Sequence, residues 1–232
     1  MQKGGKSHCS SDIEILAMLL AAAIHDMGHP GRTSIFQVKA RTEIAMQYDN
    51  NATTLLEKMH VDTAFDLFWG EEKNSDWDIL EFLTKEEETL VKSLIEYAVY
   101  GTDMSRHFRI MEDLTNLLRT EPIDSAEVNR QSLRFFLHFV DISGTIKPGL
   151  LFKYWADCVF EEFLAQGDEE KALGLPVSPM CDRETTNIAQ SQISFMTTFV
   201  KPCLDVLATL IPHAYDELIP TYEANLLHWE ES

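Results

Sequence analysis

The segment from Ile15 to Ile24 is apolar on almost every side of a helix, and it ends abruptly in the run His25-Asp26-Met27-Gly28-His29-Pro30-Gly31. A helix that is apolar nearly all round is expected to be buried among other helices. Ser11 or Asp12 can cap its start, and the proline and glycine of the run cannot continue it. The sequence therefore predicts a buried helix that ends in two imidazoles and a carboxylate.

The rest of the chain also has helical patterns. Thr84 and Glu87 form a capping-box pair at the start of one expected helix. The other helices are expected at residues 36–48, 55–69, 103–119, 126–142, 147–166, 182–199, 201–211 and 214–227. Pro202 is expected to kink or separate two of them, because proline lacks the amide hydrogen that an inner helix position needs.

Apolar and polar residues nowhere alternate over a stretch long enough to predict a sheet. We therefore expect one compact all-α, multi-helix domain at residues 12–232, preceded by a disordered or non-homologous leader at residues 1–11. A turn is expected at Asp49-Asn50-Asn51 and a charged loop at residues 70–78.

The charge balance limits the partners. Nineteen basic and 38 acidic residues give a net charge of −19, which argues against nucleic acid and anionic membrane as partners. The longest uninterrupted apolar run is about ten residues, too short to cross a bilayer. Cys9, Cys158, Cys181 and Cys203 lack the spacing of a metal or redox motif, and we expect them to be reduced, as in the cytoplasm.

Three side chains are the first candidates for chemistry. His25 and Asp26 end the first helix, and Asp141 follows the apolar helical segment Leu133–Val140. Imidazole and carboxylate groups at buried helix ends can bind a divalent metal, although Asp141 could instead be a capping residue. His138 is expected to be a hydrogen-bonded core residue, and His107 a surface or structural one.

The chain resembles the catalytic domain of the class I cyclic nucleotide phosphodiesterases, a branch of the HD-type metal-dependent phosphohydrolases. The resemblance runs from about Asp12 to Glu231. Its matching segments are Ala22–Asp26, His29–Gly31, Glu43–Ala45, Tyr48, Leu56-Glu57, His60, Thr102–Ser105, Asp141–Ser143, Trp155–Asp157, Glu161–Phe163, Gln166–Asp168, Pro179–Asp182 and Ser191–Phe195.

The resemblance implies hydrolysis of cAMP, cGMP or both to the 5′-monophosphate by a two-metal-activated hydroxide, in cyclic-nucleotide signal transduction. It implies a zinc ion held by His25, Asp26 and Asp141, and a second ion, magnesium or manganese, that shares Asp26. Two cations lower the pKa of a water between them and neutralise charge on the phosphate.

The same resemblance assigns further residues. His29 and His60 would act with the catalytic metals, and Asp103 would lie beside them or beside the substrate. The substrate's purine edge would bind Gln192, and its ring would lie among the apolar side chains Phe195, Val159 and Phe163. Without the resemblance, Asp103 would be read as a helix cap, Gln192 as a solvated residue and the phenylalanines as ordinary core.

The chain also departs from the family pattern. The family carries an upstream Tyr-His-Asn-x-x-His segment that supplies the general acid and one zinc ligand, and this sequence does not contain it. We therefore expect the domain to be N-terminally incomplete and greatly impaired on its own, because general acid catalysis contributes about 10²–10⁴-fold. Gly28 stands where the family has a second aspartate, and Gly144 where cAMP-selective members often have asparagine.

Three functions compete. The first is a cyclic nucleotide phosphodiesterase, the second a degenerate non-catalytic nucleotide-binding or interaction module, and the third a different HD phosphohydrolase. The third would not explain the match at Gln192–Phe195. The choice between cAMP and cGMP stays open, because the amide of Gln192 can offer either hydrogen-bond pattern. A homodimer also stays open.

Overall fold

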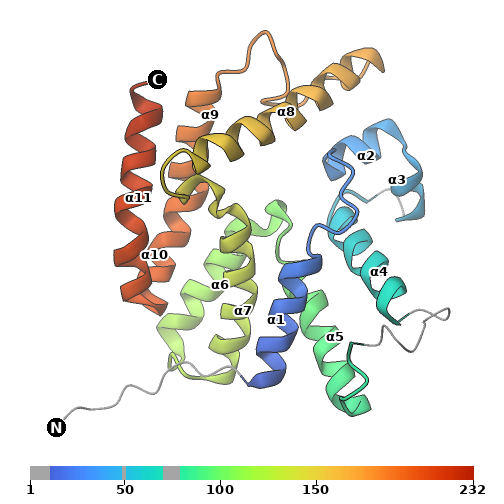
Figure 1. Ribbon diagram of the computed structural model, residues 1–232, viewed down its shortest axis with the longest axis vertical. Helices are drawn as coiled ribbons and strands as arrows, with labels where there is room; N and C mark the ends of the chain where they lie inside the picture. Colours follow the sequence, from blue (N-terminus) through green and yellow to red (C-terminus); the bar gives the residue numbers. More distant parts are fainter. Residues whose placement is uncertain (1–10, 49–50, 70–78) are drawn as a thin grey trace. The chain divides into compact units, whose positions relative to one another are not determined.

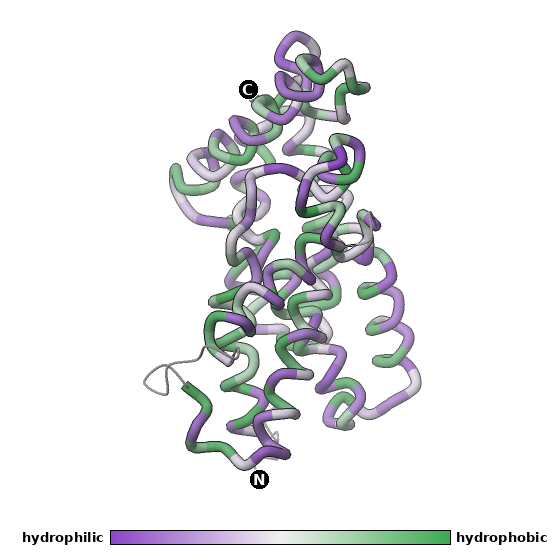
Figure 2. Tube along the Cα trace, turned by 90° about the vertical axis from the view of Figure 1, so that its right-hand side faces the viewer, coloured by the Kyte–Doolittle hydropathy of each residue, from purple (hydrophilic) through white to green (hydrophobic). Residues whose placement is uncertain are grey.

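The protein is described by a computed structural model that covers residues 11–48, 51–69 and 79–232. Every regular element in these residues is a helix and none is a strand, which confirms the all-α prediction (Figure 1). Figure 2 shows apolar and polar residues mixed along the individual helices. The predicted leader up to residue 10, the turn at 49–50 and the charged loop at 70–78 lie outside the described residues.

The chain divides into two compact units. The first contains residues 1–28 and 57–138, and the second contains residues 29–56 and 139–232. The elements of the first unit are α1 (Asp12–Ile24), α4 (Leu55–Trp69), α5 (Lys85–Val99), the 3₁₀ turn η2 (Met104–Arg106), α6 (His107–Thr120) and most of α7 (Ala126–Asp141). Helix α7 is continuous and crosses the division.

Helix α1 begins where the sequence predicted. The Ser11 hydroxyl accepts a hydrogen bond from the amide of Glu14 at 3.2 Å, and the Glu14 carboxylate accepts one from the amide of Ser11 at 2.7 Å. This reciprocal cap satisfies two backbone donors at the helix start. Thr84 and Glu87 form the same arrangement at the start of α5, which confirms the second predicted cap.

Helices α1 and α5 pack together and form the core of the first unit. The buried residues of this core are Ala17, Ala21, Ile24, Val61, Ala64, Leu80, Val91, Ile95, Ala98, Val99 and Leu137. The prediction that α1 is buried nearly all round is wrong, since Ile15 is 46% and Leu19 67% exposed. The small side chains Ala17 and Ala21 are fully buried beside α5, and Leu16 and Leu20 also pack against this core, whereas Ile15 and Leu19 do not.

The second unit is also helical. Its elements are α2 (Ser34–Ala40), α3 (Glu43–Gln47), the end of α7, the 3₁₀ segment η3 (Ile142–Ile146), α8 (Leu151–Ala172), α9 (Ile188–Phe195), the π segment η4 (Met196–Val200), α10 (Lys201–Leu210) and α11 (Pro212–Glu230). Helices α10 and α11 pack side by side (Figure 1). Their apolar side chains, including Leu204, Leu207, Tyr222 and Trp229, are buried.

The single helix predicted at 36–48 is wrong. Arg41 takes the left-handed conformation, with φ 53°, and ends α2. The Thr42 hydroxyl then accepts a hydrogen bond from the amide of Ala45 at 3.3 Å and begins α3. Threonine prefers this capping role to an inner helix position, because its hydroxyl can bond nearby backbone groups. The helical pattern of the sequence therefore continues from α2 into α3, although the backbone turns between the two helices.

Pro202 separates two α-helices without breaking the helical path. The π segment η4 precedes it, and the amide of Lys201 bonds the carbonyl of Met196, five residues back. The Tyr222 hydroxyl donates to the same carbonyl at 3.3 Å. Proline has no amide hydrogen to donate to a carbonyl of the preceding turn. A π segment accommodates it because the amides there bond carbonyls five residues back, which changes the carbonyls that need a donor.

By length and composition alone, residues 188–210 form one helical stretch that is long and apolar enough to cross a membrane. The prediction from uninterrupted apolar runs overlooked this stretch, because polar residues are scattered through it. Its α10 part packs against α11 and buries Cys203, Leu204 and Leu207, as a helix in the core of a folded unit does. Among the described residues, Cys158, Cys181 and Cys203 form no disulfide bond.

Candidate metal and phosphodiester site

The end of α1 orients the His25 ring. Nδ1 of His25 lies 2.9 Å from the carbonyl oxygen of Ala22, one turn back. A carbonyl can only accept, so Nδ1 carries the proton and the neutral ring keeps its lone pair on Nε2. Gly28 then turns the chain away with φ +74°, in a conformation that favours glycine. His25 is therefore prepared to bind a cation through Nε2.

Asp26 lies between two imidazoles. Its Oδ2 is 3.5 Å from Nε2 of His25, and its Oδ1 is 3.7 Å from Nε2 of His60 on α4. His60 is almost fully buried, and its Nδ1 lies 2.8 Å from the carbonyl oxygen of Met27. By the same reasoning His60 is protonated on Nδ1 and, when neutral, presents a lone pair on Nε2. The Nε2 atoms of two imidazoles thus lie on either side of one carboxylate.

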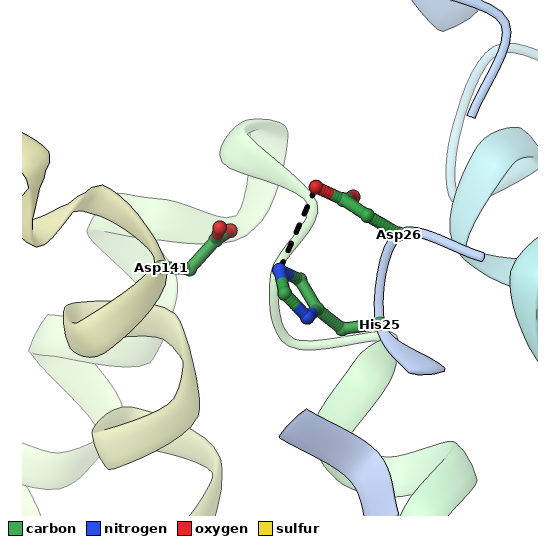
Figure 3. A group of neighbouring side chains, drawn as sticks. All are labelled: His25, Asp26 and Asp141. Carbon is green, nitrogen blue, oxygen red and sulfur yellow. Dashed lines mark ion pairs between the residues drawn. The ribbon is translucent and has the colours of Figure 1, made fainter. Parts of the chain in front are cut away.

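Asp141 completes a cluster with His25 and Asp26. It is the last residue of α7. One ligand atom from each of the three side chains lies within 4.8 Å of the others (Figure 3). Figure 3 shows Asp141 approaching from α7, while His25 and Asp26 come from the end of α1. Two carboxylates and an imidazole nitrogen are a suitable donor set for zinc, so these residues fit a divalent cation.

Glu57 is a nearby carboxyl group to which sequence reasoning gave no role. It begins the part of α4 that belongs to the first unit, and one of its oxygens is buried. The pKa of Glu57 is raised to about 7, mainly by burial, with smaller contributions from the negative charges of Asp103 and Asp26. The signal that could have found it was present, because Leu56-Glu57 belongs to the segments that resemble the family.

Asp103 is buried and caps the turn that follows it. Its Oδ1 accepts a hydrogen bond from the amide of Ser105 at 2.8 Å, and its Oδ2 is 3.8 Å from Nε of Arg106. The structure thus shows the capping role that the sequence left as an alternative. The negative charge of Asp103 also raises the pKa of Glu57, so Asp103 both caps the turn and acts on a carboxyl group of the candidate site.

His29 belongs to the second unit. Its Nδ1 accepts a hydrogen bond from the amide of Gly31 at 3.0 Å. A backbone amide can only donate, so the proton of the neutral ring is on Nε2. The backbone contact therefore selects a different neutral tautomer for His29 than for His25 and His60.

The residues expected to bind the purine all lie in the second unit. Gln192 on α9 is 6% exposed and so is not the solvated residue that a lone helical glutamine would suggest. Within the described residues, the rings of Phe195 and Phe163 pair with neighbours rather than with one another: Phe195 stacks on Phe199 at 5.4 Å, and Phe163 meets Phe160 edge-on at 5.8 Å. Val159 on α8 is partly exposed. Their joint role in base binding stays a prediction.

The sequence of the chain can be compared with those of known proteins. Residues 1–220 match the family described as 3′,5′-cyclic nucleotide phosphodiesterase. Curated relatives include the dual specificity calcium/calmodulin-dependent 3′,5′-cyclic nucleotide phosphodiesterase 1B of Homo sapiens, 41% identical, and of Bos taurus, 40% identical. Each alignment covers 204 residues, which are 88% of this chain and 36% of the relative. The chain thus spans about a third of the length of the curated relatives it matches.

Proposed function

Because the chain belongs to the 3′,5′-cyclic nucleotide phosphodiesterase family, we propose that its site binds cAMP, cGMP or both and hydrolyses the cyclic phosphodiester to the 5′-monophosphate. The observation that carries the proposal is the convergence of His25, Asp26 and Asp141 within 4.8 Å. These residues come from two helix ends that are far apart in the sequence.

We propose zinc as the ion held by His25, Asp26 and Asp141, with magnesium or manganese sharing Asp26. Such ions, when bound, supply an acidified water and neutralise charge on the phosphate. Backbone carbonyl groups orient the two imidazoles: the Ala22 carbonyl orients His25, and the Met27 carbonyl orients His60. Glu57, with a pKa near neutrality, can accept or release a proton next to Asp26.

The remaining assignments form the substrate side of the proposal. Gln192 would bond the purine edge, and Phe195, Val159 and Phe163 would cover the ring. The names of the relatives state dual specificity, which supports testing both cyclic nucleotides here. We further propose a cytoplasmic location. The net charge of −19 disfavours nucleic acid and anionic membrane as partners, and a homodimer is an assembly to be tested.

Zinc binding is the first test. Calorimetric titration of the metal-free chain should give one zinc site, and Asp141→Asn should weaken it at least tenfold, because a ligand is lost. Asp205→Asn is the matched control: Asp205 is an exposed aspartate on α10 that pairs with Lys201. Equal zinc affinity in the wild type and Asp141→Asn would contradict the proposed ligand set.

Product formation is the second test. With zinc and magnesium, the chain should convert cAMP or cGMP slowly, and far below the Homo sapiens relative, because these 232 residues lack the family's upstream histidine segment. Asp26→Asn should remove the activity that remains. Nucleotide binding that Gln192→Ala weakens, with no product at any metal concentration, would instead favour the non-catalytic nucleotide-binding module. Turnover equal to that of the relative would refute the expected impairment.

A further inference from the structure

Asp141 lies where the backbone of the second unit changes its geometry. It is the last residue of α7, and the 3₁₀ segment η3 follows it without a break at Ile142–Ile146. The last carbonyls of an α-helix have no amide partner of the regular pattern, and helix ends fray. Asp141 is also the carboxylate that α7 contributes to the candidate metal cluster (Figure 3). A loose helix end would therefore move a candidate ligand.

The hydroxyl of Ser143 bonds the peptide group of Asp141. Its Oγ donates to the carbonyl oxygen of Val140 at 2.6 Å. This carbonyl and the amide nitrogen of Asp141 belong to one peptide group, so the bond acts on the backbone immediately before the Asp141 side chain. A serine that bonds a carbonyl three residues back supplies a donor at a helix end. Ser143 is 6% exposed, so little water can compete for the bond.

A buried amide on α11 holds the other end of η3. Nδ2 of Asn225 donates to the carbonyl oxygens of Thr145 and Lys147, each at 2.9 Å. An amide nitrogen carries two hydrogens, and both are used here. Asn225 is 5% exposed and lies 80 residues after Thr145 in the chain. The contact is therefore tertiary, and it ties η3 to a helix that belongs to the same unit.

The two contacts together hold a segment that is weak by itself. A 3₁₀ helix has poorer hydrogen-bond geometry than an α-helix and rarely exceeds about four residues, whereas η3 has five. Ser143 holds its first end to the peptide group of Asp141, and Asn225 holds its last end to α11. Because Ser143 lies within η3, loss of the Asn225 contact is expected to displace the Ser143 hydroxyl as well.

We propose that Ser143 and Asn225 are positioning residues for Asp141: Ser143 fixes the peptide group of Asp141, and Asn225 holds the segment that carries Ser143. Both act only through Asp141 and are placed on neither the cation nor the substrate. A ligand whose backbone is already fixed needs little reorganisation when a cation binds. The use of the carboxylate for a cation rests on the proposed function, whereas the hold on the backbone is a property of the chain alone.

The first measurement is made by NMR on the chain without metal or nucleotide. Ser143→Ala should shift the carbonyl ¹³C resonance of Val140, because that carbonyl loses a hydrogen bond. Ser93→Ala is the matched control: on α5, the Ser93 hydroxyl also bonds a carbonyl three residues back, that of Leu90, at 2.8 Å. The control should leave the Val140 resonance in place.

The second measurement, on the same metal-free chain, follows the end of η3. The amide of Lys147 bonds the Gly144 carbonyl there at 3.3 Å. Asn225→Ala should speed exchange of this amide hydrogen by about tenfold or more, relative to the Ile211 amide of the same unit. It should also shift the Val140 carbonyl resonance. Asn225→Asp keeps the shape of the side chain but cannot donate when ionised, so it should have the same effects.

Zinc affinity then tests whether both residues act through Asp141. In titration calorimetry, Ser143→Ala and Asn225→Ala should each weaken zinc binding about tenfold, and Ser93→Ala should not. Added to Asp141→Asn, neither change should weaken it further, because the residue through which they act is already altered.

The outcomes separate positioning from general loosening. Equal weakening of zinc binding with and without Asp141 would overturn the proposal, as would an unchanged Val140 resonance in Ser143→Ala. Ser143→Ala removes only a hydroxyl, so it keeps the test decisive if the Asn225 variants do not fold. A wild type that binds no zinc would contradict the proposed function, and the hold on the backbone would then be decided by the two NMR measurements.

Discussion

Acid should destabilise the first unit through one buried pair of histidines. His107, the first residue of α6, and His138 on α7 are both fully buried. Nδ1 of His107 lies 2.8 Å from Nε2 of His138, a distance at which one nitrogen must donate and the other accept. The pKa of His107 is lowered to about 4, mainly by burial and also by the neighbouring His138. His107 therefore resists protonation while the protein is folded.

The sign and size of the effect follow from linkage. The unfolded chain binds a proton at His107 near the ordinary pKa of about 6.5, while the folded chain binds it only near pH 4. Between these values the unfolded state holds more protons, so stability falls as the pH falls and stops falling below the folded pKa. Between pH 8 and pH 5.5 the loss from this residue is about 1.4 kcal/mol. The isoelectric point of 4.7 makes lower pH unsuitable, since an uncharged surface promotes precipitation.

Urea unfolding at pH 8 and pH 5.5 measures this loss. Other groups also titrate, so the quantity to compare is the difference between the wild type and His107→Gln, which keeps a polar side chain but cannot be protonated. The variant should lose about 1.4 kcal/mol less than the wild type over this interval. His213→Gln, at an exposed position, should behave like the wild type. Equal losses in the wild type and His107→Gln, or a ¹⁵N titration of His107 centred near pH 6.5 in the folded protein, would refute the reasoning.

Other changes should have distinct effects. Gly167→Ala should cost more than about 3 kcal/mol in unfolding free energy, because a Cβ there would lie 1.7 Å from the carbonyl oxygen of Cys181; Gly144→Ala, whose nearest contact is 3.8 Å away, should change it little. Ser11→Ala should cost about 1 kcal/mol through loss of the α1 cap, measured by thermal unfolding, and no loss would contradict the capping role. Removal of zinc with a chelator should lower the melting temperature of the wild type and leave Asp141→Asn unchanged; equal shifts would contradict the ligand role.

Local sequence signals predicted local structure well. The caps of α1 and α5 were visible because capping depends on residues three apart, such as Ser11 with Glu14. The division between α2 and α3 was not visible, because Arg41 is an ordinary helix former that only the folded chain places in a left-handed turn. The exposed side of α1 was missed for a related reason. The hydrophobicity of a residue shows that it can be buried, but the packing of the other helices decides whether it is buried.

The resemblance pointed to three residues that lie close together in the structure, and their role as metal ligands stays a prediction; the orientations of the histidine rings could not be predicted from the sequence. The sequence pointed to His25, Asp26 and Asp141, and the structure brings them within 4.8 Å. Which nitrogen each histidine presents depends on a backbone carbonyl or amide nearby, such as the Met27 carbonyl that bonds His60 from thirty-three residues away. Such contacts follow from the fold and leave no pattern in the sequence.

A cation bound near Asp26 would have a second role besides chemistry, because the groups around Asp26 carry negative charge. The pKa of Glu57 is raised to about 7, mainly by burial, and the negative charges of Asp103 and Asp26 contribute to the rise, so a further negative charge beside these groups is unfavourable. The whole chain carries −19, so an anionic phosphodiester approaches against an unfavourable field. Bound divalent ions would reverse the local sign, because they are the largest charges in such a site. Metal loading should therefore strengthen nucleotide binding as well as permit hydrolysis, and a nucleotide affinity that is the same with and without metal would contradict this view.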